Sequence, residues 1–405
     1  MKGRPDYIIA ITVFILMLFG LVMISSASAI ISHENFEVND YYFWRQLVSL
    51  GVALVIWFVC QSVPLKAWQV SAPLIMLISF ATLIAVFVPG LGSSYGTASS
   101  WLDIGFLPNI QPAEYAKFAL ILFLAYYFQH RGKEVRGFAE GFIPFALFLA
   151  VVAGLIMAQP DFGTSLIVIL IAVMMYFVAG ANPMHLLFGG VLGGALFLTV
   201  VRQKAYIMNR FLAFLDPAVD PLGIGYHIQQ SLIAIGSGGI LGHGFGNSRQ
   251  KFEYLPEAQG DSIFAITSEE LGFICVIVLL IAFTIIALRG FRIARRVEDP
   301  FAKLVATGIT SWITFQALIN MGVNLALMPT TGVPLPFISY GGSSLVASTA
   351  AIGVLLHISQ YAYHDSTVRR GQWGASDATA SRGRTTLGLR ERLRNRRRGR
   401  GLSAT

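Results

Sequence analysis

Residues 254–288 read YLPEAQGDSIFAITSEELGFICVIVLLIAFTIIAL, and they join a carboxylate-rich segment to a long apolar run. The run over residues 274–288 contains no charged residue. It suits a helix crossing the hydrocarbon core of a bilayer, which takes about 20 mainly apolar residues. Four carboxylates stand before this run, at Glu257, Asp261, Glu269 and Glu270. Ionisable groups beside or within a membrane span are costly, so they indicate function.

The composition of the whole chain is that of an integral membrane protein. Of its 405 residues, 55% are hydrophobic and 12% are charged, about half the charged fraction of soluble globular proteins. Ten segments are apolar and long enough to span a bilayer. We predict these spans at residues 7–29, 44–63, 68–89, 111–128, 141–158, 162–180, 184–201, 262–288, 303–326 and 337–362. The predicted fold is an all-α integral membrane protein, with a ten-helix transmembrane domain over residues 1–363.

The distribution of Lys and Arg predicts the orientation of these ten helices, because basic residues concentrate in cytoplasmic loops. With a cytoplasmic N-terminus, 22 of the 29 basic residues fall on the inner side. Both termini are therefore predicted to be cytoplasmic. Two long loops, residues 90–110 and 202–261, are then extracellular. The second loop joins helices seven and eight, and its amphipathic pieces predict short helices at the outer leaflet.

The last segment, residues 364–405, is a basic tail without apolar periodicity, and it supplies much of the net charge of +8. We interpret it as a disordered, solvated tail that helps to fix topology. The alternative is attachment to the anionic cytoplasmic leaflet or to an acidic partner. No nucleic-acid partner is expected for so hydrophobic a chain. The seven histidines form no spaced cluster, so no metal site is predicted.

Several polar residues near the predicted helix ends have both a structural and a functional interpretation. Asp261 and Asp161 each precede an apolar helix and could be N-caps. Glu114 and Lys117, spaced i,i+3, could form an ion pair on one helix face or line a cavity that holds an anionic substrate. Arg210 could contact lipid headgroups or clamp a phosphate group.

A second unusual segment, residues 320–344, reads NMGVNLALMPTTGVPLPFISYGGSS. Its three prolines interrupt helical hydrogen bonding. Broken backbone at membrane depth is tolerated only where protein covers it or where it lines a cavity. In the predicted topology this segment, the 202–261 loop, Glu114 and Asp261 all lie toward the outer side. The sequence therefore predicts a functional site at the outer membrane face.

The motif PLPFISYGGSS, at residues 334–344, resembles the signature of the SEDS family, the RodA and FtsW proteins of bacterial cell-wall synthesis. Other segments resemble the family in the same order: QPAEYAKFAL (111–120), QPDFGTSL (159–166), IAIGSGGILGHGFGNSRQKFEYLPE (233–257) and DSIFAITSEELGF (261–273). The resemblance covers about residues 7–362 and implies ten spans. Because GNSRQKFEYLPE looks closer to FtsW than to RodA, the FtsW-like assignment is favoured.

The resemblance implies a peptidoglycan glycosyltransferase at the outer face of the bacterial cytoplasmic membrane. Such an enzyme polymerises lipid II, a lipid-linked disaccharide-peptide, during cell division or elongation and releases undecaprenyl pyrophosphate. The essential acidic residue of the family maps onto Asp261, which we interpret as the general base of an inverting transfer. Its flanks read AQGDSIFA where many members have His-Thr-Asp-Phe. Further candidates for substrate binding are Glu114, Lys117, Arg210, Glu257, Ser343 and Ser344.

Cofactors, partners and other functions follow from the same resemblance. A divalent cation on the pyrophosphate, magnesium or manganese, is the cofactor left open. The implied partner is a class B penicillin-binding protein with transpeptidase activity, together with other divisome or elongasome membrane proteins. Two alternatives are a lipid II flippase and a non-catalytic scaffold that recruits the transpeptidase. Transporters place their substrate sites near the bilayer midplane, whereas the polar features here crowd the predicted outer face.

Overall fold

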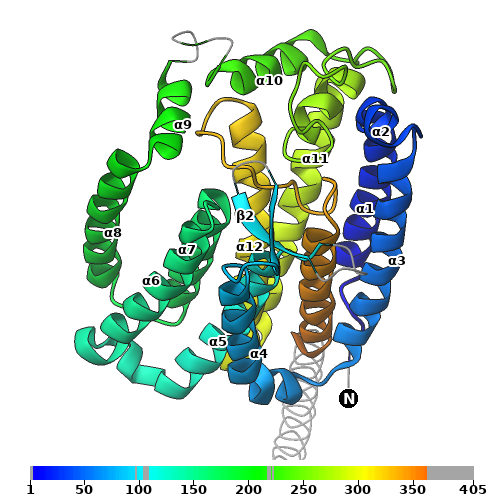
Figure 1. Cartoon of the computed structure of the whole chain (residues 1–405). Coiled ribbons are helices and arrows are strands. Elements are labelled where there is room, and N and C mark those ends of the chain that lie inside the picture. Colours follow the sequence, from blue (N-terminus) through cyan, green and yellow to red (C-terminus); the bar gives the residue numbers. More distant parts are fainter. Residues whose placement is uncertain (1–2, 96–97, 104–108, 217–219, 221–222, 363–405) are drawn as a thin grey trace, which may run out of the picture.

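The computed structural model describes residues 3–95, 98–103, 109–216, 220 and 223–362, which fold mainly into helices (Figure 1). Among these residues, eight helices are long and apolar enough to cross a membrane. They are α1 (Tyr7–Ala27), α3 (Tyr41–Ser62), α4 (Leu65–Ala85), η2 with α6 (Phe138–Ala158), α8 (Pro183–Gln203), α11 (Ile263–Arg296), α12 (Pro300–Asn324) and an unlabelled helix, Gly342–Ala362. The structure is that of a polytopic membrane protein.

The other two predicted spans are also helical but fall outside that group of eight. Helix α7 (Phe162–Val178) is apolar but shorter, and α5 (Pro112–Arg131) carries Glu114 and Lys117 within its first two turns. Each predicted range thus coincides with a helix, while the number of helices that cross a membrane stays a prediction. The shorter elements are α2 (Ala29–Phe36), η1 (Gly132–Arg136), α9 (Ala205–Leu215) and α10 (Tyr226–Ser237).

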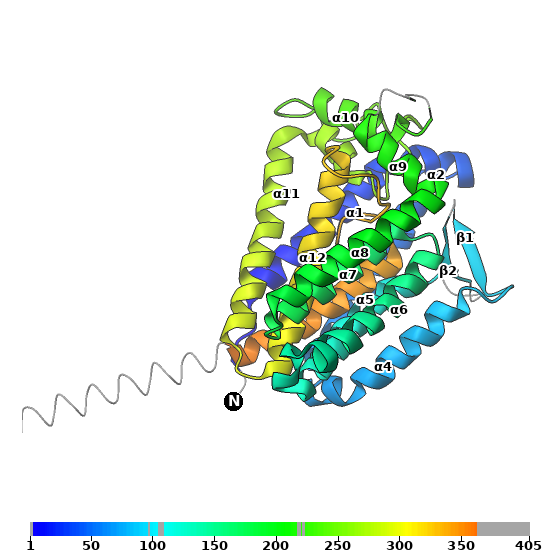
Figure 2. The ribbon, with the colours of Figure 1, turned by 90° about the vertical axis from the view of Figure 1, so that its left-hand side faces the viewer.

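The spanning helices run side by side, and α10 lies across one end of the bundle (Figures 1 and 2). At the side of the bundle opposite α10, the first and last described residues of the chain lie next to each other. The Gly3 amide donates to the Gln360 carbonyl at 3.0 Å, and the Asp6 amide donates to Ser359 Oγ at 2.9 Å. The two ends of the described chain therefore lie on the same side of the bundle, and the cytoplasmic location of both termini stays a prediction.

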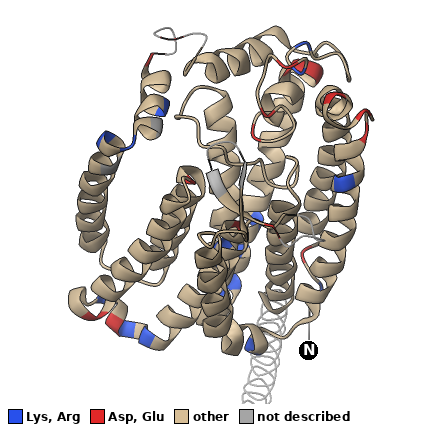
Figure 3. Ribbon diagram, in the orientation of Figure 1, with Lys and Arg blue, Asp and Glu red and all other residues tan. Residues whose placement is uncertain are grey.

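Two helices form the centre of the bundle. In α12 and Gly342–Ala362, 83% and 94% of the most apolar stretch is buried, compared with 12% in peripheral α8. Helix α12 packs against α5, α7 and α11. Large apolar side chains are exposed on the outer helices, among them Val55, Phe58, Leu77, Leu196 and Ile281. Most of the helical ribbon carries no charge (Figure 3). Lipid would cover these apolar faces.

The all-α prediction is wrong in the predicted 90–110 loop, because this loop contains a β-hairpin. Strands β1 (Gly92–Tyr95) and β2 (Ala98–Leu102) pair antiparallel, with Ser93 opposite Trp101. An isolated bridge then joins Leu102 to Ile110. The segment is too short and polar for a span, and its Tyr, Trp and Thr residues favour extended backbone.

The predicted 202–261 loop is more ordered than a connecting loop usually is. It contains α9 and α10, as its amphipathic pieces predicted, followed by a turn-rich segment over residues 238–262. The predicted 262–288 span is also longer in the structure, since α11 continues to Arg296. The prediction ended with the apolar run, but a helix needs apolar residues only inside the bilayer.

Gly272 interrupts α11 with φ 73° and ψ −173°. A Cβ atom there would lie 2.4 Å from the Gly242 nitrogen and 2.5 Å from the Ile240 carbonyl oxygen, so the 239–242 turn can pack only against a glycine. We expect Gly272→Ala to lower the free energy of unfolding by about 1–3 kcal/mol or more. Thermal unfolding in detergent measures this loss. Gly51→Ala, where a Cβ meets open space, is the control; equal stability of the two variants would contradict the prediction.

Candidate functional site

Asp261 lies directly before α11, at the end of the bundle near α10. The N-cap of α11 is Ser262 rather than Asp261, so the N-cap interpretation of Asp261 is wrong by one residue. The Asp261 carbonyl instead accepts hydrogen bonds from Asn320 Nδ2 at 2.8 Å and Asn324 Nδ2 at 2.9 Å. Both asparagines belong to the last turns of α12, so the backbone of Asp261 is fixed to the centre of the bundle.

The Asp261 side chain is partly exposed and has charged neighbours of both signs. Burial raises the pKa of the Asp261 carboxyl, and the electrostatic influence of the neighbouring His227 and Arg210 lowers it. Burial and the negative charge of Asp261 together raise the pKa of Glu257. A carboxyl held above its ordinary pKa is more basic once ionised, which suits a group that accepts a proton.

Two of these neighbours come from elements far from Asp261 in the sequence. Arg210, on α9, donates from Nη1 to the Thr330 carbonyl at 3.1 Å. His227, on α10, has its Nε2 2.9 Å from Ser262 Oγ. Sequence reasoning missed His227, because nothing in its surroundings relates it to a residue 34 positions away. The structure brings Arg210 and Glu257 to Asp261, as the prediction of one outer site required.

The predicted ion pair of α5 is present and fully buried. Lys117 Nζ lies 2.8 Å from Glu114 Oε1, with side-chain exposures of 0% and 1%. The same ammonium donates to Gln316 Oε1 at 2.7 Å and lies 5.0 Å from the centre of the Trp312 ring. The second carboxylate oxygen, Glu114 Oε2, is buried without a hydrogen-bond partner in the described part of the chain. Substrate contact by these two residues stays a prediction.

The starts of three helices converge beside this pair. Asp161 caps α7 by accepting from the Thr164 amide at 2.9 Å, so its N-cap interpretation is confirmed. Burial raises the pKa of Asp161. The Gln111 side chain donates from Nε2 to Asp161 Oδ2 at 3.3 Å. The backbone amide of Gln111 donates to Ser343 Oγ at 3.1 Å. The adjacent Ser344 is buried. The signature motif at residues 334–344 is therefore in direct contact with the start of α5.

Glu269 and Glu270 mainly hold the turn-rich segment against α11. Glu269 accepts hydrogen bonds from the Arg249 amide at 2.8 Å and from the Ser248 hydroxyl. Glu270 forms a buried ion pair with Lys251 at 3.1 Å. Only the bond to Glu270 from Ser26 of α1, at 2.6 Å, joins another helix. A structural role of these two carboxylates stays a prediction that these contacts favour.

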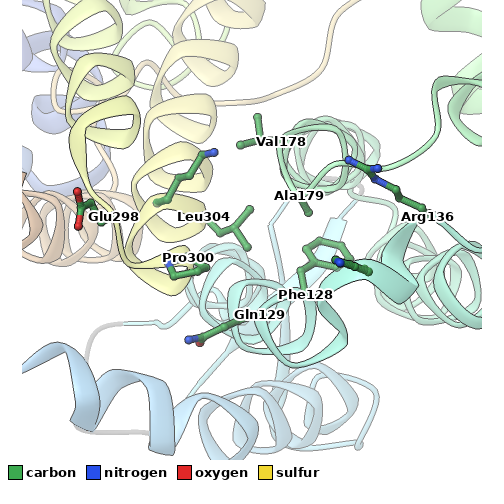
Figure 4. Close-up of a pocket in the computed structure, with 11 residues that line it drawn as sticks. Phe128, Gln129, Arg136, Val178, Ala179, Glu298, Pro300 and Leu304 are labelled. Atoms are coloured by element: carbon green, nitrogen blue, oxygen red, sulfur yellow. The ribbon is translucent and has the colours of Figure 1, made fainter.

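The best-formed pocket and the candidate site lie in different places. No group of three or more His, Cys, Asp or Glu residues suited to a metal ion occurs within the described ranges. Asp261 and Glu257 are neighbouring carboxylates that could hold a divalent cation. A pocket of about 660 Å³ lies at the opposite end of α12 (Figure 4). Its lining includes Phe128, Arg136, Glu298, Pro300 and Leu304.

The fold and site define a polytopic helical membrane protein with a conspicuous carboxylate at one end of the bundle. Residues 6–364 match the sequence model of the FTSW_RODA_SPOVE family, described as "Cell cycle protein". The chain therefore belongs to the FtsW, RodA and SpoVE family, the SEDS family that the motifs predicted. Its similarity to curated FtsW proteins also supports the FtsW-like assignment.

Two curated relatives illustrate the sequence similarity. Stage V sporulation protein E of Bacillus subtilis is 41% identical over 365 residues, covering 89% of this chain and 98% of the relative. A probable peptidoglycan glycosyltransferase FtsW of Trichlorobacter lovleyi is 39% identical over 355 residues, covering 87% and 93%.

Two solved structures illustrate the similarity of fold. A chain from the structure titled "Structural coordination of polymerization and crosslinking by a peptidoglycan synthase complex" gives a TM-score of 0.72 at 30% identity, covering 89% of this chain and 98% of that one. The crystal structure of Rod shape determining protein RodA from Thermus thermophilus gives 0.64 at 29% identity, covering 88% and 98%.

Proposed function

We propose that this protein is a peptidoglycan glycosyltransferase that polymerises lipid II at the outer face of the cytoplasmic membrane during cell division. The observation that carries the proposal is Asp261. Its carboxyl is partly exposed, its pKa is raised by burial, and its backbone is fixed to the central helix α12. Relatives named as peptidoglycan glycosyltransferases support the reaction class.

The transfer joins two sugars at the expense of the bond between C1 of the donor sugar and its pyrophosphate. The 4-hydroxyl oxygen of the acceptor N-acetylglucosamine attacks C1 of the donor N-acetylmuramic acid, while the C1–oxygen bond to pyrophosphate breaks. The Asp261 carboxylate accepts the hydroxyl proton as the new bond forms. Undecaprenyl pyrophosphate leaves with the bonding electrons, and attack from the face opposite the leaving group inverts C1.

The other candidates take supporting roles in this scheme. Arg210 is the cation beside Asp261, and its guanidinium suits the negative charge that develops on the pyrophosphate. Lys117 is fully buried and already paired with Glu114, so this pair organises the start of α5. Ser343 holds the signature motif beside it by accepting from the backbone amide of Gln111, and Ser344 stays a candidate for substrate binding. A class B penicillin-binding protein would cross-link the glycan product, in line with the peptidoglycan synthase complex to which this fold is similar.

Glycan synthesis from lipid II by the purified protein in detergent micelles tests the proposal. A micelle does not separate two compartments, so transport of lipid II across a membrane cannot contribute to the product. The assay includes a cognate penicillin-binding protein that lacks its own catalytic activity. A ladder of glycan strands on a gel is expected. Absence of product with the partner and divalent cations present would favour the flippase or scaffold alternatives.

The pH dependence of the reaction tests the pairing of Arg210 with Asp261. Arg210 lowers the pKa of the Asp261 carboxyl, and the base must be ionised to act. Arg210→Gln removes the positive charge, so we expect the acidic limb of kcat/KM to move to higher pH by about one unit or less. Arg249→Gln, an exposed cation of the 238–262 segment, is the control. An unmoved limb in Arg210→Gln would contradict the pairing.

A further inference from the structure

Buried carboxamides form a line along one face of α12. Gln316, Asn320 and Asn324 follow one another at intervals of four residues, so they lie one turn apart on the same side of the helix. Each side chain is 1% exposed. We call these three residues the α12 ladder. Three buried carboxamides in a row are expensive in the middle of a membrane protein, and the Oδ1 atoms of Asn320 and Asn324 have no hydrogen-bond partner in the described part of the chain.

The ladder spans the distance between the two polar groups of the candidate site. At one end Gln316 Oε1 accepts from Lys117 Nζ at 2.7 Å and from Trp312 Nε1 at 2.7 Å. At the other end Asn320 and Asn324 both donate to the Asp261 carbonyl. No other described element makes side-chain hydrogen bonds to both Lys117 and the Asp261 carbonyl.

The same ladder also holds the broken segment that faces Asp261. Gln316 Nε2 donates to the Pro334 carbonyl at 3.0 Å, and Asn320 Nδ2 donates to the Val333 carbonyl at 2.8 Å. A Cβ atom on Gly332 would lie 4.0 Å from Asp261 Oδ2. The segment fixed by the ladder is therefore the one that lies against the Asp261 carboxylate.

The hydrogen-bonding capacity of the Asp261 carbonyl is fully used. Both hydrogens on Asn320 Nδ2 have carbonyl acceptors, and so do both on Asn324 Nδ2, whose second acceptor is the Asn320 carbonyl at 2.9 Å. Turning either amide around would place Oδ1 against these carbonyl oxygens, so the network fixes the orientation of both amides. Two donors on one carbonyl hold the peptide after Asp261 in a single position.

We propose that the α12 ladder is the positioning device of the site, with Asn320 as its principal member. Through its two carbonyl contacts Asn320 sets the Asp261 carboxylate against the broken segment at residues 332–334, and Gln316 ties that geometry to the Glu114–Lys117 pair. The inference rests on the proposed glycosyltransferase function and adds the residues that orient its base. None of the three ladder residues contacts the reacting atoms.

Asn320→Leu tests the proposal, because leucine keeps the branching and the number of heavy atoms of asparagine and removes both donors. We expect kcat for glycan synthesis to fall about 10²-fold, with KM for lipid II nearly unchanged. Gln69→Leu, which removes an interhelical carboxamide bond to Gln129 at the other end of the bundle, is the control for folding. Asn324→Leu should lower kcat less than Asn320→Leu, by about threefold to tenfold, because it removes one donor to the Asp261 carbonyl but leaves the bond from Asn320 to the Val333 carbonyl.

The combination Gln316→Leu with Asn320→Leu tests whether the ladder acts as a unit. Residues that share a network lose less together than the product of their separate losses, so the double variant should retain about threefold or more activity above that product. Rates are divided by the folded fraction from size-exclusion chromatography.

Unchanged kcat in Asn320→Leu, or losses that disappear after this correction, would overturn the proposal. A wild type without activity would instead refute the proposed function. If Asn320→Leu does not fold, unchanged kcat in folded Asn324→Leu overturns the proposal.

Discussion

Asp261→Asn is expected to lower the rate of glycan formation from lipid II by about 10²- to 10⁴-fold, the usual contribution of a general base. Asparagine has nearly the shape of aspartate but cannot accept the hydroxyl proton. The contacts that fix this residue to α12 go to its backbone carbonyl, so the variant keeps them. Initial rates at saturating lipid II measure the loss.

Asp299→Asn is the matched control for Asp261→Asn. Asp299 also precedes a long helix, and it caps α12 at the far end by accepting from the Phe301 amide at 2.9 Å. Asparagine is as good an N-cap as aspartate, so this variant should keep the wild-type rate and stability. If Asp261→Asn and Asp299→Asn were equally active, Asp261 would not be the base, and Glu257 would be the next carboxylate to test.

Lys117→Met is expected to lower the free energy of unfolding by about 3–5 kcal/mol, because it leaves the Glu114 carboxylate buried without its partner. The loss should be larger than that of most single substitutions, since Gln316 also loses a charged donor. Combining Lys117→Met with Glu114→Gln removes both charges and should recover part of the loss. Thermal and denaturant unfolding in the same detergent measure these differences.

The chain contains a second pair with the same spacing for comparison. Arg131 and Glu134 are also i,i+3 neighbours, at 3.0 Å, but their side chains are 41% and 55% exposed. Arg131→Met should therefore cost only about 0–1 kcal/mol. Similar costs for Arg131→Met and Lys117→Met would mean that burial does not govern the Glu114–Lys117 pair.

Much of the fold could be predicted from the sequence because membrane helices follow from one strong constraint, the length of an apolar run. The run over residues 274–288 locates α11, and no comparable signal locates the kink at Gly272. That kink depends on a turn whose Ile240 carbonyl packs against Gly272. The β-hairpin at residues 92–102 was missed because short strands in a polar loop have weak local signals.

The candidate site was partly predictable for a similar reason. Glu114 and Lys117 are close in sequence, so helical spacing alone indicates their contact. Asp261 stands out because it begins an apolar run. The contacts of Asp261 with His227, Asn320 and Asn324 join segments that are distant in sequence, and the chain offers no local pattern that pairs them. Two of these contacts run to a backbone carbonyl, which a side-chain motif cannot reveal.

Glycan synthesis by the wild type and Asp261→Asn, assayed side by side in micelles with lipid II and a catalytically inactive penicillin-binding protein, tests the central claim most directly. Both proteins must first elute as folded, monodisperse species. Our account predicts glycan ladders from the wild type and none from Asp261→Asn over the same period. Ladders of equal intensity from the two proteins would contradict it.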